Sequence, residues 1–215
     1  EICQRLVGSE MCIRDSGSSS SVAATTYEIT ALELNGLTVS AGGAAVNGNA
    51  LNASDLSDDA FTNQTPSPVN VVYTVVPFTS AGCAGDSFTV TVTVNPEPVV
   101  ADQAIEVCSD EALGYTLLGD IDTPAVATYN LTNIESNGLA GASGNQVVAD
   151  GLSADALQGD VWTNETSSPV DVVYTLTPVG DNGCFGDPFT VTVTVNPEPV
   201  VADQAIEVCS DEALG

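Results

Sequence analysis

Carboxylate oxygens are the groups of this sequence with the most evident chemistry, because its 215 residues hold 29 Asp and Glu against two basic residues. Hard oxygen ligands on turns suit Ca²⁺. One set recurs around the joint Val-Asn-Pro-Glu-Pro, where the prolines fix the backbone. The candidate calcium ligands are Asn95, Glu97 and Asp102 in one copy and Asn196, Glu198 and Asp203 in the other. The alternative is a plain solvated acidic surface, since a chain without lysine has only acids to place outside.

The sequence offers few combinations of side chains that could form a catalytic site. It has no histidine, so a nucleophilic triad lacks its usual base. Two cysteines per repeat do not complete a zinc site. A carboxylate pair could hydrolyse a glycoside, but the acids differ between the copies, because Gly159 stands opposite Asp58 and Ser80 opposite Asp181. We therefore expect no enzyme, no catalytic residue and no cofactor apart from the Ca²⁺ considered above.

The first sixteen residues differ from the rest in composition and contain both basic residues, Arg5 and Arg14. The run Leu6–Asp15, LVGSEMCIRD, resembles one translated frame of a sequencing-library adapter. We interpret residues 1–16 as an artefact of that origin and exclude them from the fold argument. Residues 17–215 then carry 26 acids without a single Lys, Arg or His.

This one-sided charge limits the partners of the chain. Nucleic acids and anionic membranes are both recognised by basic side chains, which are missing here. No apolar run approaches the roughly 18 residues of a membrane span. We expect no nucleic-acid binding and no direct membrane contact. The remaining partners are neighbouring repeats of the same chain, or an extracellular glycan or protein.

An internal repeat of 101 residues organises the chain, because residues 88–114 recur unchanged at 189–215. This period is the size of a whole domain, so it indicates tandem modules. The repeat predicts a fragment that is open at both ends. Its expected parts are the artefact at 1–16, an N-terminally truncated module at 17–97, a complete module at 98–198 and the start of a third module at 199–215.

The hydrophobic pattern predicts strands and no helix. Phe189–Val195 alternates strictly between apolar residues and threonine, which indicates a half-buried strand. Val170–Pro178 pairs with it through a loop rich in Gly, Asp and Asn. Shorter strands are expected at Val99–Val107, Tyr115–Leu118, Ala127–Leu131, Gln146–Val148 and Val161–Thr163. About seven strands in about 100 residues predict an all-β fold of tandem immunoglobulin-like β-sandwich modules.

The order VCSDEALG, VVYTLTP and NGCFGDPFTVTVTVNPEP along the complete module resembles the polycystic-kidney-disease-like (PKD-like), immunoglobulin-like repeats of large secreted bacterial surface proteins. The resemblance implies a sandwich fold, export to the medium or the cell surface, and a tandem arrangement. The function it implies is a structural spacer, stalk or adhesion repeat. The alternative is an adhesive module that binds a glycan or depends on Ca²⁺.

Export also bears on the cysteines, since disulfides form in oxidising compartments. Residues 17–215 contain four cysteines, and Cys108 and Cys184 are the two within the complete module. We expect them to form a disulfide. Two free thiols are the alternative, because the end of the first strand and the loop before the last lie at opposite ends of a standard immunoglobulin sandwich.

Overall fold

The structure, a computed structural model, is all-β, as the sequence predicts, and its described residues form no helix. Among these residues there is accordingly no helix that could span a membrane. Described are residues 2–6, 9–13, 22–40, 47–119, 124–199, 201, 203 and 205–207.

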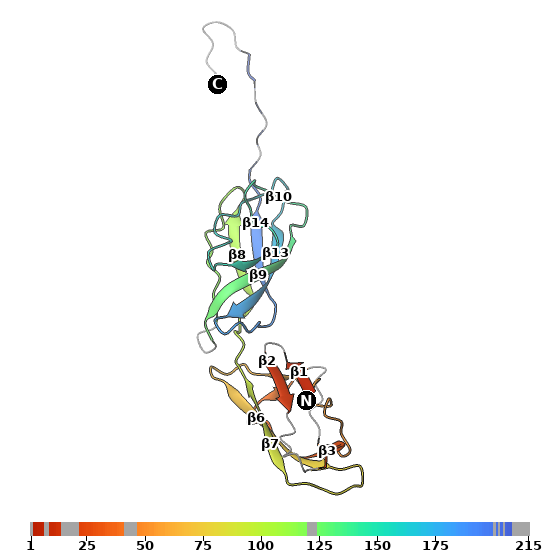
Figure 1. Cartoon of the computed structure of the whole chain (residues 1–215). Coiled ribbons are helices and arrows are strands. Elements are labelled where there is room, and N and C mark those ends of the chain that lie inside the picture. The colour runs from red at the N-terminus through yellow and green to blue at the C-terminus, as the bar shows by residue number, and fades with distance from the viewer. Residues whose placement is uncertain are drawn as a thin grey trace. The chain divides into compact units, whose positions relative to one another are not determined.

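The chain forms two compact units, and each is considered by itself (Figure 1). Unit 1 comprises Glu1–Val99, Gly119–Val126 and Val179–Gly186, and unit 2 comprises Val100–Leu118, Ala127–Pro178 and Asp187–Gly215. We call strands β3–β7 the first module and strands β8–β14 the second module. Two further strands, β1 (Ile2–Leu6) and β2 (Ser9–Ile13), pair with each other in an antiparallel hairpin.

Five strands form the main sheet of the second module (Figure 1). Their order is β11 (Ala149–Leu152), β9 (Val126–Glu135), β13 (Val170–Gly180), β14 (Phe189–Asn196) and β8 (Gln103–Cys108). A second, small sheet pairs β10 (Ala140–Gly141) with β12 (Trp162–Thr163). The inner face of β13 and β14 is fully buried, because alternate residues of a strand point to one side. Buried there are Val172, Tyr174, Leu176, Val191, Val193 and Val195.

The first module repeats this plan, with fewer strands among its described residues. Its main sheet has the order β3 (Thr26–Glu33), β6 (Val69–Phe78) and β7 (Phe88–Val94). Its small sheet pairs β4 (Thr38–Val39) with β5 (Phe61–Thr62). The core contains Ile29, Leu37, Val71, Tyr73, Val75 and Val90.

The same tight turn follows β3 and β9, at Asn35-Gly36 and Asn137-Gly138. Both residues of each pair have positive φ, near 50° for asparagine and above 90° for glycine. Asn and Gly tolerate this conformation better than other residues. The side chain of Asn35 donates to Asn70 O, and that of Asn137 donates to Asp171 O, both at 2.8 Å. These amides tie the turn to the next long strand in both modules.

Two expected strands differ in the structure. Tyr115–Leu118 is no strand but an extended segment beside residues 154–158. The strand expected at Gln146–Val148 begins three residues later, as β11. Both segments lie at the borders of sheets. There, packing against adjacent segments decides which residues pair, rather than the alternation of apolar and polar residues in the sequence.

Candidate functional site at the open edge of the first module

The opening strand closes the second module. Strand β8 pairs in parallel with β14, from Gln103 opposite Val191 to Cys108 opposite Asn196. Ile105 lies opposite Val193 in the middle of this ladder. Because β8 takes up the free edge of β14, the backbone groups on that edge are hydrogen-bonded rather than exposed.

The residues after β8 cover the core of the same module. Leu113 N donates to Asp160 O and Leu117 N donates to Ala154 O, at 2.9 and 2.8 Å. The side chains of Leu113 and Leu117 are 7% and 3% exposed. This segment, together with β8, makes the second module a closed sandwich.

The first module has the same last strand, and its described residues include no such cover. Strand β7 has the sequence FTVTVTV, as do the first seven residues of β14. Among the described residues, β7 pairs with β6 alone and is the edge of its sheet. Val193 and Val195 are fully buried, whereas their counterparts Val92 and Val94 are only partly buried. The difference in burial comes from the neighbouring strand, since the residues are the same.

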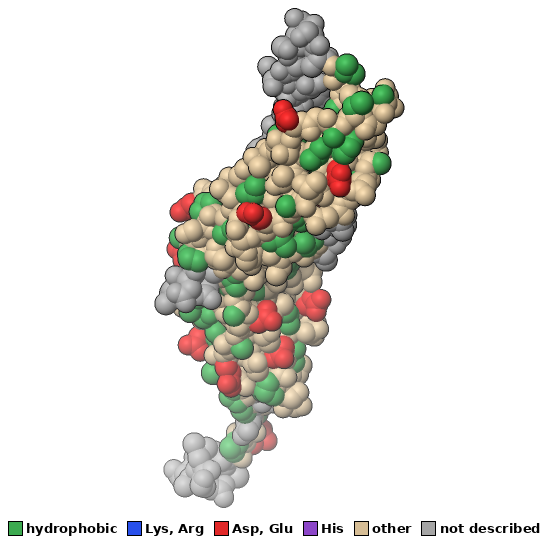
Figure 2. Space-filling model, turned by 90° about the horizontal axis from the view of Figure 1, so that it is seen from below, with side chains coloured by type: hydrophobic (Ala, Val, Ile, Leu, Met, Phe, Trp, Pro, Cys, Tyr) green, Lys and Arg blue, Asp and Glu red, His purple; other side chains and the backbone are tan. Residues whose placement is uncertain are grey.

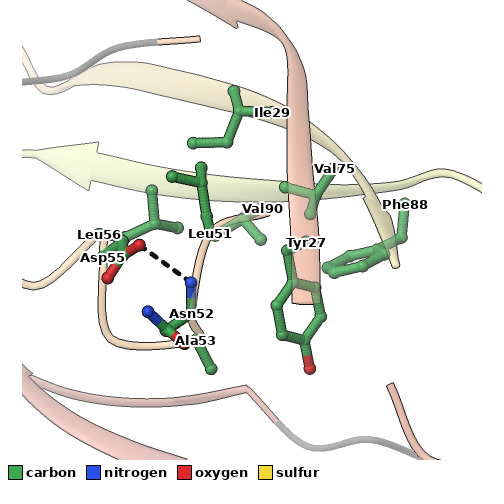
Figure 3. A pocket seen from close by; sticks show the side chains of 10 residues that line it. All are labelled: Tyr27, Ile29, Leu51, Asn52, Ala53, Asp55, Leu56, Val75, Phe88 and Val90. Carbon is green, nitrogen blue, oxygen red and sulfur yellow. Dashed lines mark hydrogen bonds between the residues drawn. The ribbon is translucent and has the colours of Figure 1, made fainter. Parts of the chain in front are cut away.

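A small apolar pocket lies beside this edge (Figure 3). Ala53 lines it and is the counterpart of Ala154, whose carbonyl oxygen binds the amide of Leu117 in the second module. We infer that the pocket marks the position that Leu117 covers in the second module. The other lining residues are Tyr27, Ile29, Leu51, Asn52, Asp55, Leu56, Val75, Phe88 and Val90.

A buried tyrosine–aspartate pair recurs in the two modules. Tyr174 Oη donates to Asp160 Oδ2 at 2.8 Å and accepts a hydrogen bond from Trp162 Nε1 at 2.7 Å. Tyr73 Oη donates to Asp59 Oδ2 at 2.6 Å. Burial raises the pKa of Asp160 and Asp59, and the hydrogen bonds they accept oppose this rise. Burial also raises the pKa of both tyrosines, which therefore remain donors at neutral pH.

A buried asparagine organises the turn before the second-last strand. Asn164 Nδ2 donates to Ser168 O and Val195 O, and its Oδ1 accepts from the backbone and hydroxyl of Thr166. Asn63 makes the same bonds with the corresponding residues of the first module. All hydrogen-bonding groups of this amide are used within the module, so the Asn-x-Thr pattern is structural here.

Comparison with known families accounts for this shared architecture. The model of the PKD-like domain matches residues 38–98 and 105–199. The chain belongs to the PKD-like domain family. No curated protein matches the chain. The match supports the repeat and the β-sandwich fold that the sequence predicts, and the Tyr–Asp pair and the Asn turn recur in both matched segments.

Several residues of the PKD-like modules that are predicted to bind calcium already make hydrogen bonds within the chain. Asp102 Oδ1 accepts from the amide and the hydroxyl of Thr190. Glu97 accepts from Gln64, and Asn196 donates to Glu106. Asn95 and Asp203 are exposed. Calcium binding at either joint stays a prediction.

A different acidic group surrounds Glu198. A hydrogen bond with Asp110, partial desolvation and the charges of Asp110 and Glu165 raise the pKa of Glu198. Even so, the described part of the chain has no group of three or more Asp, Glu, Cys or His side chains that could hold a metal ion. Acidic side chains are scattered over the face shown in Figure 2 rather than gathered in one patch.

The predicted Cys108–Cys184 disulfide is wrong for this PKD-like module, because both thiols are free. Cys108 lies opposite Asn196, at the C-terminal end of β14, whereas Cys184 precedes Phe189, at the other end. At about 3.3 Å per residue, β14 separates these ends by roughly 23 Å. A disulfide needs Cα atoms within about 7 Å. The parallel direction of β8 therefore excludes the bond within a module.

Sequence reasoning missed the buried polar residues of the PKD-like modules. Asp59 and Asp160 are acids at one position of the repeat, and Asn63 and Asn164 begin Asn-x-Thr triplets at another, but neither feature by itself predicts a buried residue. The signal was present, because both pairs occupy equivalent positions of the repeat. A polar residue kept in both copies while its neighbours change indicates a structural hydrogen bond.

Proposed function

We propose that these PKD-like modules are load-bearing spacers of an exported repeat protein, and the parallel pairing of β8 with β14 carries the proposal. These are the first and last strands of the second module, and they are neighbours in one ladder. Tension entering at Gln103 and leaving at Asn196 pulls the two strands along their axes in opposite directions. The hydrogen bonds between them then share the load and must break together, which resists unfolding better than opening one bond at a time.

The distribution of shared residues also supports a passive module. Residues that occupy the same position in both copies, such as the Tyr–Asp pair, are used in bonds inside each module. Exposed loop positions differ, since Phe185 is 58% exposed and its counterpart is Ala84. A ligand site common to the repeats would need shared exposed side chains. Export fits the family, whose members are typically extracellular.

Single-molecule force spectroscopy on the full chain tests the mechanical role. The second module is expected to unfold at a higher force than the first, in which the described strands include no parallel partner for β7. Ile105→Pro should lower the force at which the second module unfolds, because the amide of Ile105 points toward β14 and proline lacks this donor. The bond from Ser109 N to Asn196 O places the odd-numbered amides of this segment toward β14.

Ala104→Pro is the matched control, because an even-numbered amide points away from β14 and proline is tolerated on an edge strand. In the Ala104→Pro chain, the second module should unfold at the same force as in the native chain. Equal, low forces for the two native modules would contradict the proposal. Saturable binding of the full chain on an array of glycans would instead support the adhesive alternative, and antibody labelling of intact cells would test export.

A further inference from the structure

The triplet Asn-x-Ser/Thr, with any residue except proline in the middle, is the acceptor pattern for N-linked glycans in exported proteins. Residues 17–215 contain it four times, beginning at Asn52, Asn63, Asn130 and Asn164. An oligosaccharyltransferase must reach both the asparagine amide and the hydroxyl two residues later. The hydrogen bonds of each triplet therefore decide whether the folded chain can carry a glycan there.

Two of the triplets are closed by their own hydrogen bonds. The amides of Asn63 and Asn164 are buried, and each donates to two backbone carbonyl oxygens. The hydroxyls of Thr65 and Thr166 donate to the same two asparagines. A sugar on either amide would break these bonds and would have to enter the core.

A third triplet is held inside a sheet. Asn130 lies within β9, which has β11 on one side and β13 on the other. Its Oδ1 accepts from Gly151 N at 3.0 Å, and the hydroxyl of Thr132 donates to Thr175 O at 3.0 Å. Leu131, the middle residue, is fully buried. An enzyme could reach this triplet only by pulling the strand out of its sheet.

The triplet that begins at Asn52 lies on a turn instead of a strand. Asn52 and Ser54 are both exposed, and neither side chain has a hydrogen-bond partner among the described residues. Only the backbone of Asn52 is bonded, because its amide donates to Asp55 Oδ2 at 2.9 Å and its carbonyl oxygen accepts from Asp55 N at 3.1 Å (Figure 3). The amide and the hydroxyl that a transferase reads are thus both accessible.

The second module shows that this position stays at the surface of a closed sandwich. Ser153 is the counterpart of Asn52 and is exposed as well. The turn is the same, since Ala156 N donates to Ser153 O at 3.1 Å. The backbone of the turn therefore does not depend on which side chain stands here, and a group attached to this side chain extends into solvent.

We propose that Asn52 is an acceptor for an N-linked oligosaccharide. The donor is a lipid-linked oligosaccharide. The amide nitrogen of Asn52 attacks C1 of the first sugar, the bond from C1 to the pyrophosphate oxygen breaks, and the amide loses one proton as the lipid pyrophosphate leaves. This modification requires export of the chain, which is part of the proposed function, but it does not require a mechanical role.

Secretion of the full chain from cells that perform N-glycosylation tests the site, with a cleavable secretion signal in front. The intact mass of the secreted chain should show one glycan, which a peptide N-glycosidase removes. This enzyme leaves aspartate at the modified position, so digestion at acidic residues should find the conversion at Asn52 alone. A secreted chain without a glycan, or with its glycan at another triplet, would overturn the proposal.

Two variants separate the acceptor from an effect on folding. Asn52→Ser introduces the residue of the second module, so the secreted chain should carry no glycan and should melt like the native chain after glycan removal. Ser54→Ala keeps the asparagine but removes the hydroxyl, and it should abolish the glycan as well. A glycan that persists in Ser54→Ala would refute this acceptor. None of these outcomes changes the expected unfolding force of the second module.

Discussion

Tyr174 and Asp160 are joined inside the second module by a hydrogen bond of 2.8 Å from the phenol to Oδ2. The phenol oxygen also accepts from Trp162 Nε1. Tyr174→Phe leaves both partners buried without a bond, and each such loss costs about 1–3 kcal/mol. We expect the free energy of unfolding to fall by about 2–5 kcal/mol. Trp162 is the only tryptophan of the chain, so its fluorescence follows this module alone.

Tyr73→Phe is the matched control for this prediction. It removes the corresponding bond to Asp59 in the first module and should leave the transition monitored by Trp162 unchanged. An unaltered midpoint for Tyr174→Phe would contradict a structural role of the pair.

Asn164→Asp should destabilise the second module strongly. The side-chain nitrogen donates to Ser168 O and Val195 O, so a carboxylate oxygen would face two carbonyl oxygens in a buried site. We expect a loss of about 3 kcal/mol or more in denaturant titrations. Asn130→Asp is the control, because the side chain of Asn130 is needed there only as an acceptor, from Gly151 N. Equal losses for the two variants would speak against the buried turn.

Stability should rise as the pH falls from neutral toward about 4. Burial raises the pKa of Asp59 and Asp160 above its ordinary value of 3.8, so the folded chain binds these protons more tightly than the unfolded chain. Their contribution is fully present below pH 3.8 and is lost as the pH rises through the raised pKa. Thermal melts at constant ionic strength measure this, and Asp160→Asn should flatten the pH dependence of the Trp162 signal. Lower stability at pH 5 than at pH 7 would contradict it.

Salt should stabilise the chain by screening. Residues 17–215 contain 26 acids and no base, so surface charges repel one another. NaCl and CaCl₂ at matched ionic strength should raise the melting temperature by similar amounts. A saturable effect of Ca²⁺ at micromolar to millimolar levels, against high NaCl, would instead establish the calcium site predicted at Asn95, Glu97 and Asp102 or at their counterparts.

The thiols of Cys108 and Cys184 should remain separate after oxidative export. Alkylation followed by digestion at acidic residues should give both cysteines as modified peptides, since trypsin finds no site beyond Arg14. A peptide pair joined by a Cys108–Cys184 disulfide would mean that the second module can adopt a different strand arrangement from the one described here.

The sequence by itself determined the local structure of the modules. The alternation in Phe189–Val195 specifies a strand, because successive side chains of extended backbone point to opposite faces. The Asn137-Gly138 pair specifies the turn after β9, because both residues accept positive φ. The recurrence of residues 88–114 indicated tandem modules, and the sequence motifs within these modules indicated the family. These features depend on short stretches of chain.

Only the tertiary structure decided what each shared residue does. Val92 and Val193 stand in the same sequence, FTVTVTV, yet Val193 is fully buried because β8 and the segment to Leu117 cover its sheet. The parallel direction of β8, which also excluded the disulfide, joins residues nearly 90 positions apart in the chain. No local pattern encodes such a pairing, because the free energy that selects it comes from apolar area buried between distant segments.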